Sequence, residues 1–343
     1  MSWWAIFLAF AVTAGLTWRF CSPKSSFYLL DHPNDRSLHE QPTPRSGGVA
    51  VLGGIVAGGF VIAVTEPQNA GRLAMLLTGL PLAMISFLDD RFGIRACIRL
   101  LVHAVSAAAL LSFVYTPGLI IMVPGLGPLF PAMLEITAAL LFIVWVINLY
   151  NFMDGMDGFA AGMTIIGFTT CALIGVQTGH LLFATFALLI AGATAGFLLF
   201  NFPPAKIFLG DTGSSVLGFL MAALSMWASH DGIFPLWLAM LIFSPFIVDA
   251  TVTLLLRLLR GEKIWQAHRS HYYQRLVQWG WGHRRTVLAE YALMLACSLS
   301  ALASLNMSQN TQLGIFVGWL SLYTLLIFGI ERHERCRIRS LRS

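Results

Sequence analysis

Residues 181–200 read LLFATFALLIAGATAGFLLF, twenty consecutive positions without a charged side chain. A helix of about 20 apolar residues is long enough to cross the roughly 30 Å hydrocarbon layer of a membrane. Similar runs lie on both sides of this one, and we count eleven in all: 2–20, 48–65, 73–88, 100–116, 132–150, 159–176, 181–200, 213–229, 234–256, 286–306 and 312–330. The alternating ten-residue strands of a membrane barrel do not occur. The sequence therefore predicts an all-α, polytopic membrane protein.

The composition agrees with this prediction. Hydrophobic residues make up 57% of the chain and charged residues only 11%, against roughly a quarter charged in soluble proteins. The sequence has no tandem repeat, no long linker and no low-complexity segment. We therefore expect residues 1–343 to form a single integral membrane domain.

The basic residues predict how the spans are oriented. When the runs are taken in order, every one of the 21 Lys and Arg residues except Arg72 falls on the same side. The positive-inside rule makes that side the cytoplasm, so the N-terminus is expected outside and the C-terminus inside. This distribution also accounts for the net charge of +5 without a nucleic-acid partner. Most acidic residues share the cytoplasmic side, where we expect the function.

Polar residues repeat every third position at the end of one run. Asn148, Asn151, Asp154 and Asp157 follow this spacing in the segment NLYNFMDGMDG, residues 148–158. A continued helix would place the four side chains along one strip. Such a strip is costly at the end of a membrane span unless the groups have partners, so a binding site is favoured over a simple helix cap.

Two shorter acidic motifs also lie on the cytoplasmic side. Asp89 and Asp90 are adjacent and would repel each other, which predicts compensation by a metal ion, by the following arginines or by a raised pKa. Asp211 stands between Gly210 and Gly213 at the start of a span, where a carboxylate can approach Mg²⁺. A hydrated loop for the first motif and a helix cap for the second remain open at this stage.

Basic and histidine-containing loops supply candidate groups for binding anions. Arg45 lies in the proline- and glycine-rich stretch PTPRSGG, residues 42–48, which suits a loop that contacts phosphate. Lys206 is a further candidate for substrate binding. The last large loop carries His271 and Arg275, whose donors suit a pyrophosphate. A zinc site built on His268 and His271 is the alternative, but no further close ligand completes it.

An intramembrane carboxylate leaves a second function class open. Asp249 follows Pro245 inside a predicted span, and a broken helix with an acidic residue is typical of an ion site in a transporter or flippase. A scaffold subunit of a membrane complex would need none of these motifs. Because the other acidic residues gather at one surface rather than at the midplane, we favour an enzyme.

Together these motifs resemble the polyprenyl-phosphate N-acetylhexosamine-1-phosphate transferases, a family related to the peptidoglycan phospho-MurNAc-pentapeptide translocase. The resemblance covers almost the whole chain through five ordered motifs: the loop at 42–48, Asp89-Asp90, the run at 148–158, the Gly210–Ser214 motif and the histidine loop. It implies transfer of a sugar 1-phosphate from a UDP-N-acetylhexosamine to undecaprenyl phosphate at the cytoplasmic face of a bacterial inner membrane, with release of UMP. A homodimer is also implied.

The resemblance also implies roles for individual residues. Asp211 would bind Mg²⁺, or Mn²⁺ in its place, and Asp89 and Asp90 would handle the lipid phosphate as base or by positioning it. The expected substrate-binding residues are Arg45, Asn148, Asn151, Asp154, Asp157, Lys206, His271 and Arg275. Tyr273 and Gln274 stand where relatives often have further histidines. This last motif is most similar to that of the branch that starts O-antigen or similar lipopolysaccharide and cell-surface polymers.

Overall fold

The helix α9 (Gly210–His230) runs through the middle of the protein and is buried along almost its whole length. It packs against α6, α4 and α2, and its many Gly, Ala and Ser residues allow close approach. At Gly48 of α2, for example, a Cβ atom would lie 2.1 Å from the backbone nitrogen of Gly213. The helix α2 therefore needs glycine where it contacts the central helix.

The protein is seen in a computed structural model that describes residues 2–33, 38, 41–119, 123–124, 131–263 and 268–342. The first half contains α1 (Trp3–Phe20), β1 (Leu30–Asp31), β2 (Thr43–Pro44), α2 (Gly47–Thr65), the 3₁₀ turn η1 (Pro67–Asn69), α3 (Ala70–Leu77), α4 (Leu80–Phe92), α5 (Ala96–Val114) and α6 (Ala132–Phe152). The second half contains α7 (Phe159–Gln177), α8 (Leu181–Asn201), α9, α10 (Leu236–Ile242), α11 (Ser244–Leu259), α12 (Tyr272–Leu276), the π-helical turn η2 (Val277–Trp281), α13 (Gly282–Ser304) and α14 (Gln309–Arg342).

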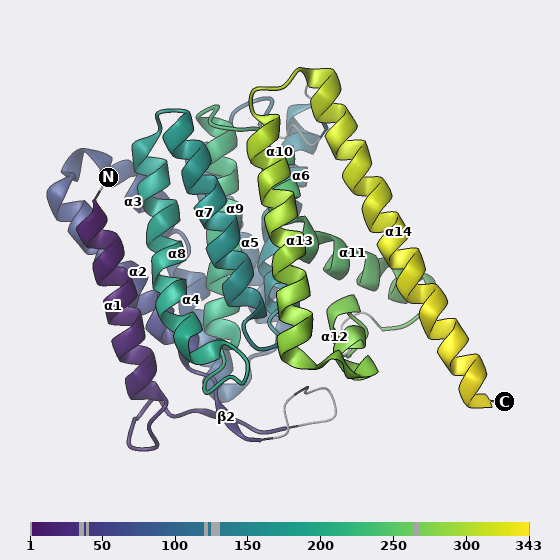
Figure 1. Ribbon diagram of the computed structural model, residues 1–343. Coiled ribbons are helices and arrows are strands. Elements are labelled where there is room, and N and C mark those ends of the chain that lie inside the picture. Colours follow the sequence, from purple (N-terminus) through teal and green to yellow (C-terminus); the bar gives the residue numbers. More distant parts are fainter. Residues whose placement is uncertain are drawn as a thin grey trace.

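The prediction of an all-α membrane protein is confirmed. Among the described residues, nine helices are long and apolar enough to span a membrane, and two bent pairs raise the number to eleven. The N-terminus and the C-terminus lie at opposite ends of the bundle (Figure 1), as an odd number of crossings requires. Which end faces the cytoplasm stays a prediction.

Two of the eleven predicted spans are broken. The run at 73–88 bends by 44° between α3 and α4, and the run at 234–256 bends by 85° between α10 and α11. Pro81 and Pro245 each lie in the first turn of the second helix, where a missing N–H costs least. Length and hydropathy alone did not reveal these breaks.

The predicted polar strip on a continuous helix is also wrong in part. The helix α6 ends at Phe152, and residues 153–158 form a turn that leads into α7. Asn148 and Asn151 therefore lie on the helix, whereas Asp154 and Asp157 lie on the turn. Gly158, which has a φ of +72°, closes that turn.

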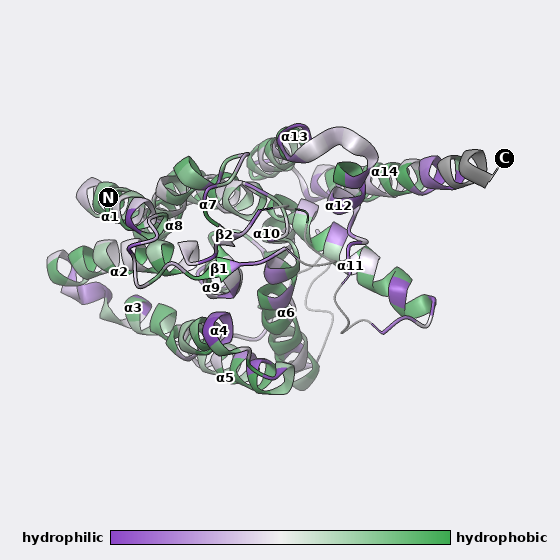
Figure 2. Cartoon of the chain, turned by 90° about the horizontal axis from the view of Figure 1, so that it is seen from below, coloured by the Kyte–Doolittle hydropathy of each residue, from purple (hydrophilic) through white to green (hydrophobic). Residues whose placement is uncertain are grey.

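The hydrophilic residues gather at one end of the bundle. Figure 2 views this end directly and shows hydrophilic residues on α4, α6 and α9 among otherwise hydrophobic helices. The same end, lower in Figure 1, carries β2 and α12. All five sequence motifs are found there.

Candidate active site

Asp90 fixes the start of the central helix. Its carboxylate accepts hydrogen bonds from the backbone N–H of Asp211 at 3.0 Å and from that of Thr212 at 2.9 Å, and the Thr212 hydroxyl also donates to it. The N-terminus of a helix attracts negative charge and has unpaired N–H groups. Asp90, which is 5% exposed, therefore ties the end of α4 to the beginning of α9.

The loop motif at 42–48 packs against this junction. Pro44 and Gly47 pair with the backbone of Phe208, at 2.7 and 3.0 Å. Arg45 donates from its guanidinium to the backbone carbonyl of Asp90. Gly210 has a φ of +75°, and a Cβ atom there would lie 2.4 Å from the carbonyl oxygen of Arg45. The glycine of the Gly210–Ser214 motif is thus required by the contact with the first loop.

Asp211 is held by an arginine and an asparagine. Nη1 of Arg99 lies 3.1 Å from one carboxylate oxygen of Asp211, and the amide of Asn151 donates to the other at 2.9 Å. The same Arg99 nitrogen pairs with Asp89, whose second oxygen accepts the N–H of Ile94 at 2.6 Å. Arg99 therefore links two predicted site residues. The sequence analysis did not assign it a role, although it is the third arginine after Asp89-Asp90.

Among the carboxylates of the site, Asp154 has the fewest side-chain contacts. Within the described part of the chain its side chain has no hydrogen bond or ion pair, although its backbone N–H donates to the carbonyl of Asn151, and the residue is half-buried. Burial, together with the charges of Asp211, Asp90 and Asp157, raises the pKa of Asp154 well above its usual range. We call Asp89, Asp90, Asp154 and Asp211 the carboxylate cluster.

The other predicted members of the 148–158 run point elsewhere. The amide of Asn148 donates to the carbonyl of Val144 and lies 3.3 Å from Nδ1 of His103, one turn away from the cluster. Both oxygens of Asp157 have close partners: one accepts the N–H of Ala205 at 3.0 Å, and the other lies 3.1 Å from Nδ1 of His283, an ion-pair distance. The spacing of three thus does not bring all four side chains to one point.

The histidine loop contacts the turn at 153–158. His271, which is 2% exposed, stacks on Phe152 with 6.4 Å between ring centroids. Its Nδ1 lies 3.1 Å from Asp249, which also accepts the N–H groups of Tyr272 and Tyr273. Asp249 therefore anchors the start of α12 and orients His271. Asp249, the intramembrane acid that raised the alternative of a transporter, thus has a structural role at the histidine loop.

Two predicted substrate-binding residues lie outside these contacts. Arg275 pairs with Glu331 at 2.8 Å and with Glu334, both on α14, and its guanidinium lies over the ring of Tyr272. This arrangement favours an anchoring role for Arg275. Lys206 is exposed, and its backbone N–H bonds to Phe200.

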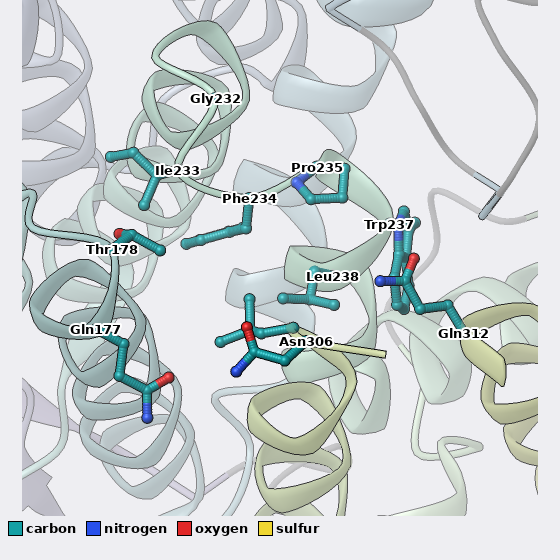
Figure 3. A pocket seen from close by; sticks show the side chains of 11 residues that line it. Gln177, Thr178, Gly232, Ile233, Phe234, Pro235, Trp237, Leu238, Asn306 and Gln312 are labelled. Atoms are coloured by element: carbon teal, nitrogen blue, oxygen red, sulfur yellow. The ribbon is translucent and has the colours of Figure 1, made fainter. Parts of the chain in front are cut away.

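A cavity of about 430 Å³ lies at the opposite end of the bundle. Its lining comes from the connections between α7 and α8, α9 and α10, and α13 and α14. Figure 3 shows the amides of Gln177, Asn306 and Gln312 around apolar side chains such as Trp237. It contains none of the predicted site residues and no acid or base, so it is separate from the candidate active site.

Comparisons with known proteins match most of the chain. The glycosyl transferase family 4 signature matches residues 72–229. A probable undecaprenyl-phosphate N-acetylglucosaminyl 1-phosphate transferase of Bacillus subtilis (strain 168) is 31% identical over 304 residues, which cover 87% of this chain and 81% of that protein. The chain belongs to glycosyl transferase family 4.

Two further relatives show similar identity. A decaprenyl-phosphate N-acetylglucosaminephosphotransferase of Mycobacterium tuberculosis (strain CDC 1551 / Oshkosh) is 30% identical over 316 residues, 84% of this chain and 78% of that protein. A phospho-N-acetylmuramoyl-pentapeptide-transferase of Pelotomaculum thermopropionicum is 29% identical over 293 residues, 79% of this chain and 86% of that protein. The family resemblance found from the motifs is confirmed.

Proposed function

We propose that this protein transfers an N-acetylhexosamine 1-phosphate from a UDP-sugar to undecaprenyl phosphate and releases UMP. One observation carries the proposal: the carboxylate cluster, Arg99 and the turn at 153–158 converge at the hydrophilic end of the bundle of a glycosyl transferase family 4 chain. The similar proteins are named for transfer of N-acetylglucosamine phosphate to polyprenyl phosphates. We assign that end to the cytoplasmic face of a bacterial inner membrane.

The donors of the cluster fit a divalent cation. They are carboxylate oxygens, hard ligands of the kind that Mg²⁺ and Mn²⁺ prefer. No three His, Cys, Asp or Glu side chains among the described residues already converge with metal-site geometry. The side chain of Asp154, however, has no hydrogen-bond or ion-pair partner among the described residues and lies near the charges of Asp211 and Asp90, so the cluster has more negative charge than Arg99 compensates. Asp211 would hold the cation, with Asp154 beside it.

The reaction is a phosphoryl substitution between anions. An oxygen of the lipid phosphate bonds to the sugar-linked phosphorus, and the bond from that phosphorus to the oxygen it shares with the uridine phosphate breaks. UMP leaves with that oxygen and its electron pair. A bound Mg²⁺ would neutralise negative charge on the phosphate oxygens. The barrier is mainly electrostatic, so positioning and charge compensation are the main tasks of the protein.

The residues of the chain divide these tasks. Arg99 offers positive charge beside Asp89 and Asp211, and Asn151 orients Asp211 from the other side. Both oxygens of Asp89 are already bonded, to Arg99 and Ile94, which favours positioning of the lipid phosphate over proton removal. A phosphate monoester has a second pKa near 6 and needs little help from a base at neutral pH. The product would start a lipid-linked surface polysaccharide such as O-antigen.

The proposal is tested by UMP release from purified protein. Release should require a UDP-N-acetylhexosamine, undecaprenyl phosphate and Mg²⁺ together, and Asp211→Asn should lower it by at least about a thousandfold while the protein still inserts in membranes. Glu66→Gln, an acid at the opposite end of the bundle, serves as the matched control and should keep wild-type release. Near-normal release by Asp211→Asn would refute the assignment of the cation to Asp211.

A further inference from the structure

The Asp157-Gly158 turn is fixed from several directions. Asp157 accepts the N–H of Ala205, and the N–H of Gly158 donates to the side-chain oxygen of Asn201 at 2.9 Å. From α13, the hydroxyl of Tyr291 donates to the carbonyl of Gly158 at 2.6 Å. Each of these three contacts uses a backbone group. The remaining one, made by His283, joins two side chains.

His283 is the second residue of α13 and connects three distant segments. Its Nδ1 lies 3.1 Å from Oδ1 of Asp157, and its side chain is 19% exposed. The imidazole also bonds to the backbone of Leu38, in the loop that leads to Arg45. The first loop, the turn at 153–158 and the beginning of α13 therefore meet at this side chain.

The location of these contacts indicates which substrate they affect. Leu38, Asp157 and Ala205 lie on connections between helices. A water-soluble nucleotide sugar suits such polar connections, whereas the apolar tail of a polyprenyl phosphate favours the hydrocarbon layer. The lipid phosphate, in contrast, was assigned to Asp89 and Asp90 near the end of α4, where Arg99 of α5 pairs with Asp89. Because both oxygens of Asp157 have close partners, this residue acts through the position of its turn, which also carries Asp154.

We propose that His283 is a positioning residue for the nucleotide-sugar side of the site, a role that rests on the proposed function. By pairing with Asp157 and bonding to Leu38, it holds the turn at 153–158 and the first loop in the arrangement that binds the UDP-sugar. Positioning of this kind strengthens substrate binding without entering the chemical step, so the expected effect of its loss is on KM.

The test separates the two substrates kinetically. His283→Ala should raise KM for UDP-N-acetylglucosamine at least about tenfold, leave KM for undecaprenyl phosphate within about twofold and change kcat by less than about threefold. His283→Asn keeps an N–H donor near the place of Nδ1 and should show a smaller rise. Arg284→Gln changes the exposed neighbouring residue and should behave as wild type. If His283→Ala does not accumulate in the membrane, His283→Gln takes its place. The longer glutamine side chain carries its amide beyond the position of Nδ1 and so also removes the contact with Asp157.

A double-mutant cycle with Asp157→Asn tests the contact itself. The effects of His283→Ala and Asp157→Asn on KM for the UDP-sugar should be markedly less than additive, as for residues that act as a pair. Unchanged KM in His283→Ala, equal rises for both substrates, or additive effects would overturn the proposal. A wild-type protein that releases no UMP would instead refute the proposed function.

Discussion

At the scale of residues, the candidate site combines groups that stabilise the fold with one that opposes it. Asp90 and Asp157 have partners for their oxygens, and Asp90 also satisfies N–H groups at the start of α9. The charged form of Asp154, in contrast, is destabilised by burial and by the like charges of neighbouring carboxylates. Unfavourable electrostatics of this kind are typical of positions kept for function rather than stability.

Asp154→Asn should therefore stabilise the metal-free protein while it removes activity. A folded-state pKa above the unfolded one means that the charged carboxylate destabilises the fold once the pH exceeds the unfolded pKa, near 3.9. In EDTA at pH 7.5 we expect Tm to rise by a few degrees, with a gain that shrinks as the pH is lowered toward 4. Thermal unfolding in detergent measures this, and a lower Tm at pH 7.5 would show that Asp154 supports the fold.

At the scale of elements, the long helix α14 is attached to the site through the half that lies at the hydrophilic end of the bundle. It has 34 residues, and most of it is exposed. Glu331 and Glu334 nevertheless pair with Arg275 of α12, and the ring of His333 lies 4.8 Å from that of Trp279. The position of the histidine loop thus depends on α14.

An exchange of charges distinguishes anchoring from substrate binding at Arg275. Arg275→Glu alone should lower activity by about tenfold or more, because it places three acids together. Combining it with Glu331→Arg and Glu334→Arg should restore a large part, since the ion pairs form again in reverse. UMP release by the triple variant is the measurement. If UMP release does not recover although the triple variant reaches normal levels in the membrane, Arg275 binds the pyrophosphate as the sequence predicted.

The sequence predicted the elements better than their junctions. Hydrophobic runs located the spans because length and apolarity are local properties. The 85° bend between α10 and α11, the end of α6 at Phe152 and the bonding of Arg99 to both Asp89 and Asp211 depend on contacts between distant segments. The three-residue spacing of the polar run pointed to the correct region, but Asn148 faces His103 rather than the carboxylate cluster.

At the scale of the whole molecule, the charge pattern and the opposite positions of the termini predict one orientation. Cys97 and Cys336 are exposed, and both belong to the hydrophilic end assigned to the cytoplasm. A membrane-impermeant maleimide should leave the wild-type protein unlabelled in intact cells and label it after permeabilisation. Ser308→Cys, between α13 and α14, should be labelled in intact cells. Labelling of the wild type in intact cells would reverse the assigned orientation.

The central claim is that the sugar moves together with its phosphate. The most direct test uses UDP-N-acetylglucosamine labelled with ¹⁴C in the sugar and ³²P in the sugar-linked phosphate, with undecaprenyl phosphate and Mg²⁺. The account predicts that both labels enter the lipid product in equal molar amounts and that the released nucleotide is unlabelled UMP. A lipid carrying ¹⁴C without ³²P, with labelled UDP released, would show transfer of the sugar alone and contradict the account.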